Sequence, residues 1–365
     1  MNVYIWEDVP SKTYTIVWNE TSDPSQFFVR YEDDAAWLTQ WSTDFDTFFW
    51  YYGCRLSNAW AETSTVQQSS PWTLDITQLW TLTSWDNVMI AFPRRWIKIS
   101  KSWTQVTLSI TDAPNKEWYQ YYAHTKGSDA KSKLYLWAYK MVSWYKSLSW
   151  AAPLANHTRT TFRSWVKSSY DSSAWTNRYS QITIYARWYI NALYMMKYGN
   201  PNSQSVVWMW YVWGNAAVNT WGTNNQTSAT YWTTSTTAQA KLFWIEDWRG
   251  NLFEFMDCCY FNENTQLTVD KTNSIFQDSD YATNLWTASS WYLKWIDWSN
   301  DGMFMNVANW WSDTTYYTDA NYSGAATVPY AGWYWNNNTS AGVFYWSRTP
   351  VQNMADSMGS RLMYL

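Results

Sequence analysis

Two neighbouring cysteines, Cys258 and Cys259, are the side chains in this sequence with the widest choice of chemistry. An ionised thiol can act as a nucleophile, a redox group or a soft metal ligand. Adjacent cysteines rarely form a disulfide without distorting the backbone between them. Together with Cys54 they make three cysteines, too few for a disulfide framework. We therefore interpret all three as structural thiols.

Metal chemistry based on histidine has little support, because the chain contains two histidines, His124 and His157. Calcium is the one cofactor that the sequence leaves open, since hard cations prefer oxygen ligands. Loop residues that could supply such oxygens are Asp297, Asn300, Asp301, Asn309 and Asp313. Their spacing matches no defined calcium loop, so we expect solvated loop side chains and no cofactor.

The segment 333–357 has the strongest claim to a binding function. It combines Tyr with Asn and Ser, as antibody paratopes do, where rigid rings supply contact area and short polar side chains adapt to the ligand. The candidate contact residues are Tyr334, Asn336, Asn337, Asn338, Ser340, Tyr345, Ser347, Asn353, Asp356 and Ser357. The alternative is an ordinary polar loop in an Asn-rich chain.

The composition is anomalous, with 34 Trp against 11 Gly. Glycine averages about 7% of residues in proteins. Many Trp stand beside Asn, Asp or Ser, as in Val17-Trp18-Asn19 and Asp297-Trp298-Ser299, where turns normally use the positive φ of glycine. We interpret most of these Trp as glycine positions, encoded by UGA in a genetic code that reads this codon as Gly. Such residues should be exposed at turns or have φ above zero.

The alternative is a genuinely Trp-rich protein, whose exposed rings would form aggregation-prone patches.

The bulk properties exclude other classes. The formal net charge is −4 with 15% charged residues, which argues against a nucleic-acid partner. No apolar run reaches the roughly 18 residues of a membrane helix, and the N-terminus has no basic segment or apolar core of a signal peptide. We expect no membrane insertion, and export by lysis or in a particle.

The pattern of apolar residues predicts an α+β chain with two parts. Residues 1–80 should form a small β-rich N-terminal domain for attachment or oligomerisation, and the likeliest linker is the polar stretch 62–70. Residues 85–365 should form the larger domain, with one helix over 178–198 that ends at Gly199. Strands are predicted at 14–17, 27–31, 88–93, 97–100, 106–110, 134–141, 241–247, 251–256, 291–296, 303–307, 341–345 and 360–365, with a polar loop at 215–239.

Two C-terminal stretches carry a family resemblance. The segment KLFWIEDWRGNLFEF at 241–255 becomes KLFGIEDGRGNLFEF when Trp244 and Trp248 are read as glycine. It then resembles the G-(I/L)-E-(D/N)-x-x-G-N-(V/L)-(W/F)-E-(W/F) signature of C-type-lectin-like folds of the formylglycine-generating-enzyme type. The segments 331–338, 341–345 and 358–362 resemble the G-G-x-W-N-N, A-G-x-F and (I/M)-G-(S/F)-R-L motifs of the same fold. In this alignment Trp335 is a true tryptophan.

The resemblance implies a set of scaffold residues. They are Glu246, Gly250, Asn251, Glu254, Trp335, Gly359 and Arg361. We expect Arg361 to be a buried anchor that pairs with Glu246 or Glu254. The likeness is strong over the C-terminal third and weaker over 85–365.

The same resemblance extends to phage tail receptor-binding proteins and to the variable proteins of diversity-generating retroelements. It implies a non-enzymatic homo-oligomer, a trimer, on a virion tail or another extracellular surface. Its partner would be a host-surface protein or glycan, and 333–357 would be the variable region, since mutated Asn codons yield mainly Asn, Ser, Tyr, Asp, Thr and Gly. Two alternatives are a formylglycine-generating-type enzyme, which needs a reactive cysteine, and a structural tail or surface protein of fixed sequence.

Overall fold

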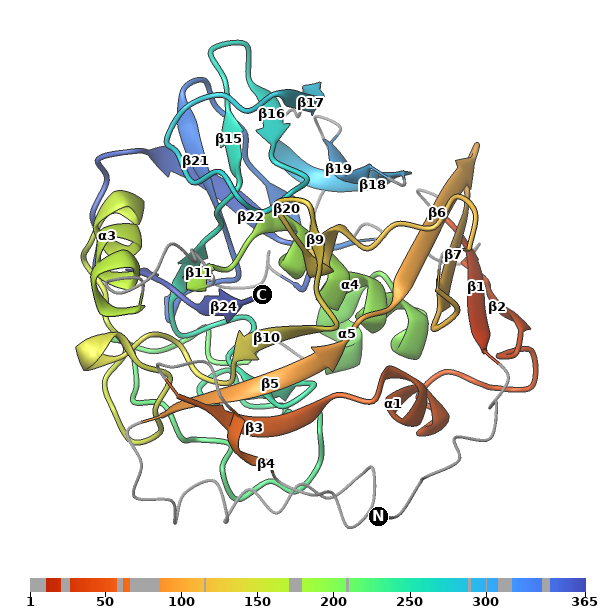
Figure 1. Cartoon of the computed structure of the whole chain (residues 1–365), viewed down its shortest axis with the longest axis horizontal. Coiled ribbons are helices and arrows are strands. Elements are labelled where there is room, and N and C mark those ends of the chain that lie inside the picture. Colours follow the sequence, from red (N-terminus) through yellow and green to blue (C-terminus); the bar gives the residue numbers. More distant parts are fainter. Residues whose placement is uncertain are drawn as a thin grey trace.

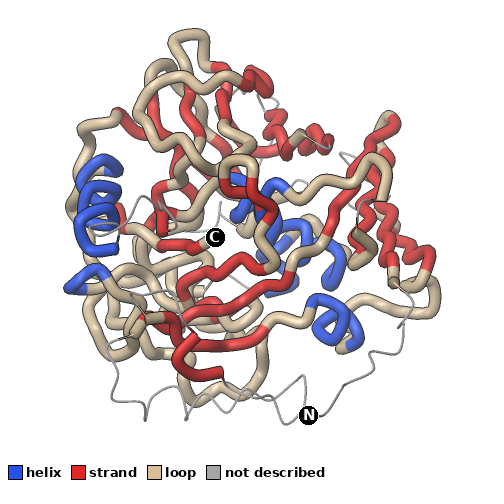
Figure 2. The backbone as a smooth tube through the Cα atoms, in the orientation of Figure 1, coloured by secondary structure: helices blue, strands red, loops and turns tan. Residues whose placement is uncertain are grey.

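The computed structural model is an α+β protein in which strands predominate. It describes residues 11–20, 27–57, 62–65, 86–114, 116–170, 179–207, 210–287, 290–299, 301–307, 317–336 and 342–365. Three main sheets surround the helix α4 (Ile184–Tyr198), and long loops connect their strands (Figures 1 and 2). All fifteen residues of α4 are buried, so this helix is the centre of the apolar core.

The first sheet has four antiparallel strands in the order β2-β1-β7-β6. Their bounds are β1 (Thr13–Asn19), β2 (Val29–Asp33), β6 (Trp96–Ser102) and β7 (Gln105–Thr111). In β7 the apolar residues Val106, Leu108 and Ile110 are buried at every second position. This period confirms the strand predicted at 106–110, because alternate side chains of a strand point to the same face.

The second sheet has the order β11-β24-β10-β5-β3-β4. Its strands are β3 (Tyr52–Leu56), β4 (Glu62–Thr65), β5 (Asn87–Pro93), β10 (Lys133–Trp137), β11 (Tyr179–Gln181) and β24 (Leu362–Tyr364). The end of the chain therefore pairs with its middle, since β24 lies between β10 and β11.

The described part of residues 1–80 does not form a sheet of its own, which corrects the expected separate N-terminal unit. Strand β1 pairs with β7, and β3 pairs with β5. The predicted linker also begins too early, because Glu62–Thr65 is strand β4. The physical reason is that β1 and β3 bury apolar side chains in the cores shared with later strands, which a sequence pattern cannot assign to a partner.

The third sheet has ten strands and contains part of the C-terminal motifs. Its main path is β17-β16-β15-β21-β22-β20-β18-β19, with β14 beside β21 and β23. The bounds are β14 (Phe253–Phe255), β15 (Cys259–Phe261), β16 (Gln266–Val269), β17 (Thr283–Thr287), β18 (Trp291–Ser299), β19 (Gly302–Val307), β20 (Ala320–Asn321), β21 (Thr327–Ala331), β22 (Trp346–Pro350) and β23 (Met358–Gly359). Two small hairpins join β8 (Thr125–Lys126) to β9 (Asp129–Ala130) and β12 (Lys241–Leu242) to β13 (Ile245–Glu246).

The strand predicted at 341–345 is wrong in its described part. Residues 342–345 form a turn that leads into β22. The amide of Val343 donates to Ser203 Oγ at 2.7 Å, and the amide of Phe344 donates to Asp319 Oδ2 at 3.1 Å. Side chains therefore satisfy backbone groups that a strand would use for its ladder.

The helix predicted at 178–198 ends as expected but begins later. Gly199 has φ 55 and closes the helix, whereas Thr183 caps its start by accepting a hydrogen bond from the amide of Ala186. The remaining helices are α1 (Asp44–Phe49), α3 (Arg159–Tyr170), α5 (Ser203–Val207) and the short 3-10 turns η2 (Tyr122–His124) and η3 (Ser143–Tyr145). None of the helices in the described ranges has the length and apolar character needed to cross a bilayer.

Ten tryptophans have a backbone φ above zero, which is nearly half of the 21 described non-glycine residues in this state. They are Trp41, Trp50, Trp103, Trp118, Trp144, Trp150, Trp210, Trp221, Trp244 and Trp291. Eight of the ten are exposed. The expectation of exposed or left-handed Trp is confirmed at these positions. It is wrong at Trp18, Trp248, Trp298 and Trp333, which are buried and have no positive φ.

Trp103 provides a direct stability test, because it has φ 58 and is 95% exposed in the turn between β6 and β7. A side chain in the left-handed region costs roughly 1–2 kcal/mol, which glycine avoids. We expect Trp103→Gly to raise the free energy of unfolding in urea by about 1 kcal/mol. The control Trp137→Gly, in the buried strand β10, should lower it by about 3–5 kcal/mol. A destabilised Trp103→Gly protein would contradict the interpretation.

Candidate functional site

The candidate segment 333–357 is held at both ends by the motif strand β14. Glu254 on β14 lies opposite Ala331 of β21 and Gly359 of β23. Next to these pairs, the amide of Trp335 donates to the carbonyl of Asn251 at 3.1 Å, and the amide of Phe253 donates to the carbonyl of Ser357 at 2.9 Å. The segment is thus a long connection between β21 and β23, the two strands that lie beside β14.

Glu254 is the centre of a buried ion cluster. Its Oε1 accepts hydrogen bonds from Lys140 Nζ and Arg361 Nε, both at 2.8 Å, and its Oε2 accepts one from Arg187 Nη1 at 3.1 Å. All four side chains are at most 4% exposed. Burial alone would raise the pKa of Glu254, but the three cations outweigh it and lower the pKa to about 2.

The predicted pairing of Arg361 with Glu246 or Glu254 is resolved in favour of Glu254. Arg361 also donates to the main-chain carbonyls of Glu246 and Trp137, both at 2.6 Å. The carboxylate of Glu246 accepts instead from the amides of Trp221 and Thr223, at 2.8 and 2.9 Å. Burial, followed by the charge of Asp247, raises the pKa of Glu246 to about 7. Glu246 therefore anchors the polar loop 215–239 to the scaffold.

Gly250 and Asn251 form the tight turn before β14. Gly250 has φ 83, and a Cβ there would lie 2.7 Å from the carbonyl oxygen of Tyr211, so the position requires glycine. Asn251 accepts from the amide of Val218 at 2.9 Å and donates to Asp247 at 2.9 Å. These contacts support the scaffold roles that the resemblance implies.

Two further scaffold residues occupy the ends of the segment. A Cβ at Gly359 would lie 3.2 Å from the carbonyl oxygen of Leu154 and 2.8 Å from Leu252 Cδ1, so the chain passes too closely for a side chain. Trp335 is half-buried, and its ring lies edge-on to Tyr334 with the centroids 5.5 Å apart.

The candidate contact residues divide into exposed and buried sets. Asn336, Asn353 and Asp356 are exposed, and Tyr334 and Ser357 are partly exposed. Asn337, Asn338 and Ser340 lie outside the described residues.

Tyr345 and Ser347 are buried, which corrects their prediction as surface contacts. Tyr345 is 3% exposed, because its ring stacks on Phe253 at 6.1 Å and meets Trp333 edge-on at 4.3 Å. Ser347 is 6% exposed on β22, opposite Tyr330 of β21. Both belong to the support of the segment, since their side chains are buried.

The exposed residues present a mixed polar and aromatic surface. The ring of Tyr334 packs against Phe253 with centroids 4.9 Å apart, and burial and the charge of Asp356 both raise its pKa. The exposed Trp213 is bridged to Asn336, and Met354 is also exposed. Sequence analysis did not identify these last two residues, because their polar loops show no periodic signal. The surface offers hydrogen bonds and ring contacts on a fixed support, which suits recognition.

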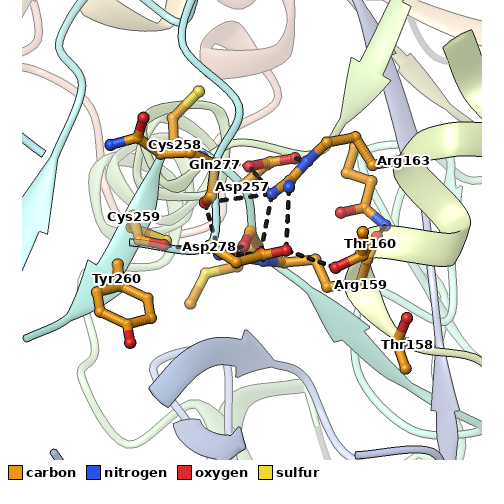
Figure 3. Close-up of polar contacts among 12 residues, drawn as sticks. Thr158, Arg159, Thr160, Arg163, Asp257, Cys258, Cys259, Tyr260, Gln277 and Asp278 are labelled. Atoms are coloured by element: carbon orange, nitrogen blue, oxygen red, sulfur yellow. Dashed lines mark hydrogen bonds and ion pairs between the residues drawn. The ribbon is translucent and has the colours of Figure 1, made fainter. Parts of the chain in front are cut away.

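The two cysteines are buried beside a second ion cluster (Figure 3). Arg163 binds Asp257 through two hydrogen bonds of 3.0 and 2.9 Å, and Arg159 contacts Asp278 at 2.7 Å. Burial raises the pKa of Cys259 to about 12 and that of Cys258 well above its ordinary value. Burial therefore disfavours the thiolate form of both side chains, and the thiolate is the nucleophilic form of cysteine.

The calcium hypothesis gains no support from the described residues. Asp301 is exposed, and its Oδ1 accepts a hydrogen bond from Lys271 Nζ at 2.6 Å, so a cation already faces it. Asn300, Asn309, Asp313 and the side chain of Asp297 are outside the described part. In the ranges that the structure describes, there is no cluster of three or more His, Cys, Asp or Glu side chains that could hold a metal.

Comparison with known proteins gives a distant structural likeness. No protein-family model matches the chain, and no curated protein matches it. Among solved structures, PvdO from Pseudomonas aeruginosa is similar with a TM-score of 0.30 and 9% sequence identity, over 76% of this chain and 94% of that chain. A likeness this distant says nothing about what the chain binds.

The importance of the Glu254 cluster can be measured by Glu254→Gln. Removing the carboxylate leaves three buried cations without their partner, so we expect the free energy of unfolding at pH 7 to fall by about 3–5 kcal/mol. The exposed control Glu32→Gln should change it by less than about 0.5 kcal/mol.

The pH dependence follows from the lowered pKa. Glu254 stabilises the fold above its unfolded pKa of 4.5, and this contribution is lost as the pH falls towards about 2. The difference in the free energy of unfolding between the unsubstituted protein and Glu254→Gln should therefore become smaller as the pH falls through this interval. Urea titrations at each pH measure this difference. A Glu254→Gln protein as stable as Glu32→Gln would contradict the role of the cluster.

Proposed function

We propose that this protein is a non-enzymatic receptor-binding protein with a C-type-lectin-like domain, and that it recognises a host-surface protein or glycan. The observation that carries the proposal is a set of exposed or partly exposed side chains on a segment held by buried strands, namely Tyr334, Asn336, Asn353, Asp356 and Ser357. Tyr and Asn side chains on a rigid support lose little conformational entropy when they bind.

The proposal includes assembly on a phage tail or a comparable extracellular surface. A homo-trimer would present three copies of the segment to one cell. Simultaneous binding would raise a weak single-site affinity through the effective concentration of the linked sites.

We also propose that the segment is diversified by a retroelement. The exposed contact residues carry Tyr, Asn, Asp and Ser, which mutation of Asn codons produces. The buried Tyr345 and Ser347 lie on the same segment and provide an internal control, because changes there would disturb the core.

Deep sequencing of the gene in its native population tests this proposal. Substitutions should concentrate at Tyr334, Asn336, Asn353, Asp356 and Ser357, while Tyr345 and Ser347 stay constant. Uniform sequence at the five exposed positions would overturn diversification and favour a fixed-sequence tail or surface protein. Equal variation at exposed and buried positions would contradict the assignment of the contact surface.

The left-handed tryptophans support the proposal that the natural protein carries glycine there. Glycine adopts positive φ without a steric cost, whereas Trp103, Trp118 and Trp144 adopt it while exposing large rings to solvent. A glycine-rich surface would have smaller apolar patches and more adaptable turns.

Tandem mass spectrometry of the protein from its native source, with the codons of the gene, tests the recoding. We expect UGA codons and glycine masses at Trp103, Trp118 and Trp144, and a UGG codon with a tryptophan mass at Trp335. Tryptophan masses at all four positions would show that the rings are genuine.

A further inference from the structure

A second loop, residues 213–219, lies directly beside the candidate contact residues. Trp213 and Asn336 form an antiparallel bridge, and the amide of Gly214 donates to the carbonyl of Trp335 at 2.5 Å. The loop and the segment 333–357 are distant in sequence, but at this bridge they pair as neighbouring antiparallel strands do.

The register of the bridge brings Asn215 next to Tyr334. In an antiparallel pair, residues two positions beyond a bridged pair are again opposite each other and point to the same face. Asn215 therefore lies opposite Tyr334, on the face that also carries Trp213 and Asn336. All four residues are exposed or partly exposed, so the loop and the segment present one continuous surface to solvent.

Asn251 holds the loop and the segment in this arrangement. Its carbonyl accepts from the amide of Trp335 at 3.1 Å, while its side chain accepts from the amide of Val218 at 2.9 Å and donates to the carbonyl of Val218 at 3.0 Å. Two residues later, the amide of Phe253 donates to the carbonyl of Ser357 at 2.9 Å. An extended chain advances about 3.3 Å per residue, so the loop and both ends of the segment meet this stretch within about 7 Å.

The combined surface carries almost no charge. Asp356 is the only charged residue in the ranges 213–219, 334–336 and 351–357. Tyr334 is partly exposed and Met354 is exposed on the same segment. The centres of protein–protein interfaces are depleted in charged residues and enriched in aromatic residues and Met. The composition of this surface therefore suits a protein partner.

The size of the surface points to the same partner. A stable protein interface uses roughly 20–30 residues from each side. The five exposed or partly exposed contact residues of the segment are too few for such an interface, so the surface beside them must take part.

We propose that the loop 213–219 is a second contact element of the binding surface, and that the exposed Asn215 and Asn219 are among its contacts. The combined surface binds an uncharged patch of a folded host-surface protein. This inference rests on the proposed function, because it takes the segment 333–357 as the first contact element.

Binding of the labelled full chain to intact host cells, measured by flow cytometry, tests the second contact element. Asn215→Arg and Asn219→Arg each place a bulky charge on the loop. Each should raise the apparent dissociation constant about tenfold or more, because a charge buried without a partner opposes binding. The matched control Asn264→Arg should leave it unchanged, since Asn264 is exposed in the turn between β15 and β16, at the other end of β21 from the segment.

Melting temperatures separate lost contacts from lost structure. Substitutions of exposed residues usually change stability little, so all the arginine variants should melt as the unsubstituted protein does. Where Asn215→Arg or Asn219→Arg melts at a lower temperature, the alanine variant of the same residue replaces it and should weaken binding several-fold.

Asn336→Arg distinguishes failure of this inference from failure of the proposed function. If Asn336→Arg weakens binding but the two loop variants bind as Asn264→Arg does, the second contact element is wrong and the proposed function stands. If the unsubstituted protein does not bind, or if Asn336→Arg binds equally well, the proposed function fails and the inference fails with it.

Treatment of the cells identifies the class of partner. Protease treatment should abolish binding, and periodate oxidation, which destroys sugar diols, should leave it intact. Binding that survives protease, or that is lost after periodate, would contradict the protein partner and favour a glycan.

Discussion

The buried carboxylate of Glu254 brings together parts of the chain that are far apart in sequence. Lys140 follows β10, Arg187 lies on α4, and Arg361 directly precedes β24, so three elements meet at one side chain of β14. Desolvating these charges is costly, and only their mutual attraction in a region of low dielectric offsets it. Any arrangement that separates Glu254 from its cations leaves buried charges unpaired. The cluster therefore selects one packing of the strands around α4.

This constraint also explains why the exposed segment can be polar without being loosely attached. Its ends leave from β21 and return at β23, the two neighbours of the strand that carries Glu254. Its own residues Trp333 and Tyr345 are buried and pack with Phe253 of β14. On a support of this kind, substitutions of surface side chains should have little effect on the core, because their backbone is held by buried residues.

The second constraint is the backbone at the turns. Ten tryptophans with positive φ occupy a conformation whose steric cost is small for glycine alone. Gly250, with φ 83 and the carbonyl oxygen of Tyr211 close by, shows what such a turn requires. The positions of these turns follow from the strands that they connect, and a glycine would adopt the same backbone conformations without the steric cost.

Part of the structure could be predicted from the sequence, because it depends on local interactions. The alternation in β7 follows from periodicity, and the end of α4 at Gly199 follows from helix capping. Both depend on near neighbours in the sequence. The pairing of Arg361 with one of two motif glutamates follows from charge, because few candidate partners exist. Tertiary structure alone decided that β1 and β3 join sheets with β7 and β5, since an apolar strand face fits many partners. It also decided that Tyr345 and Ser347 are buried while Asn336 and Asp356 are exposed, and that the loop 213–219 lies beside residues 334–336. Burial depends on which surfaces meet, and that is set by contacts distant in sequence.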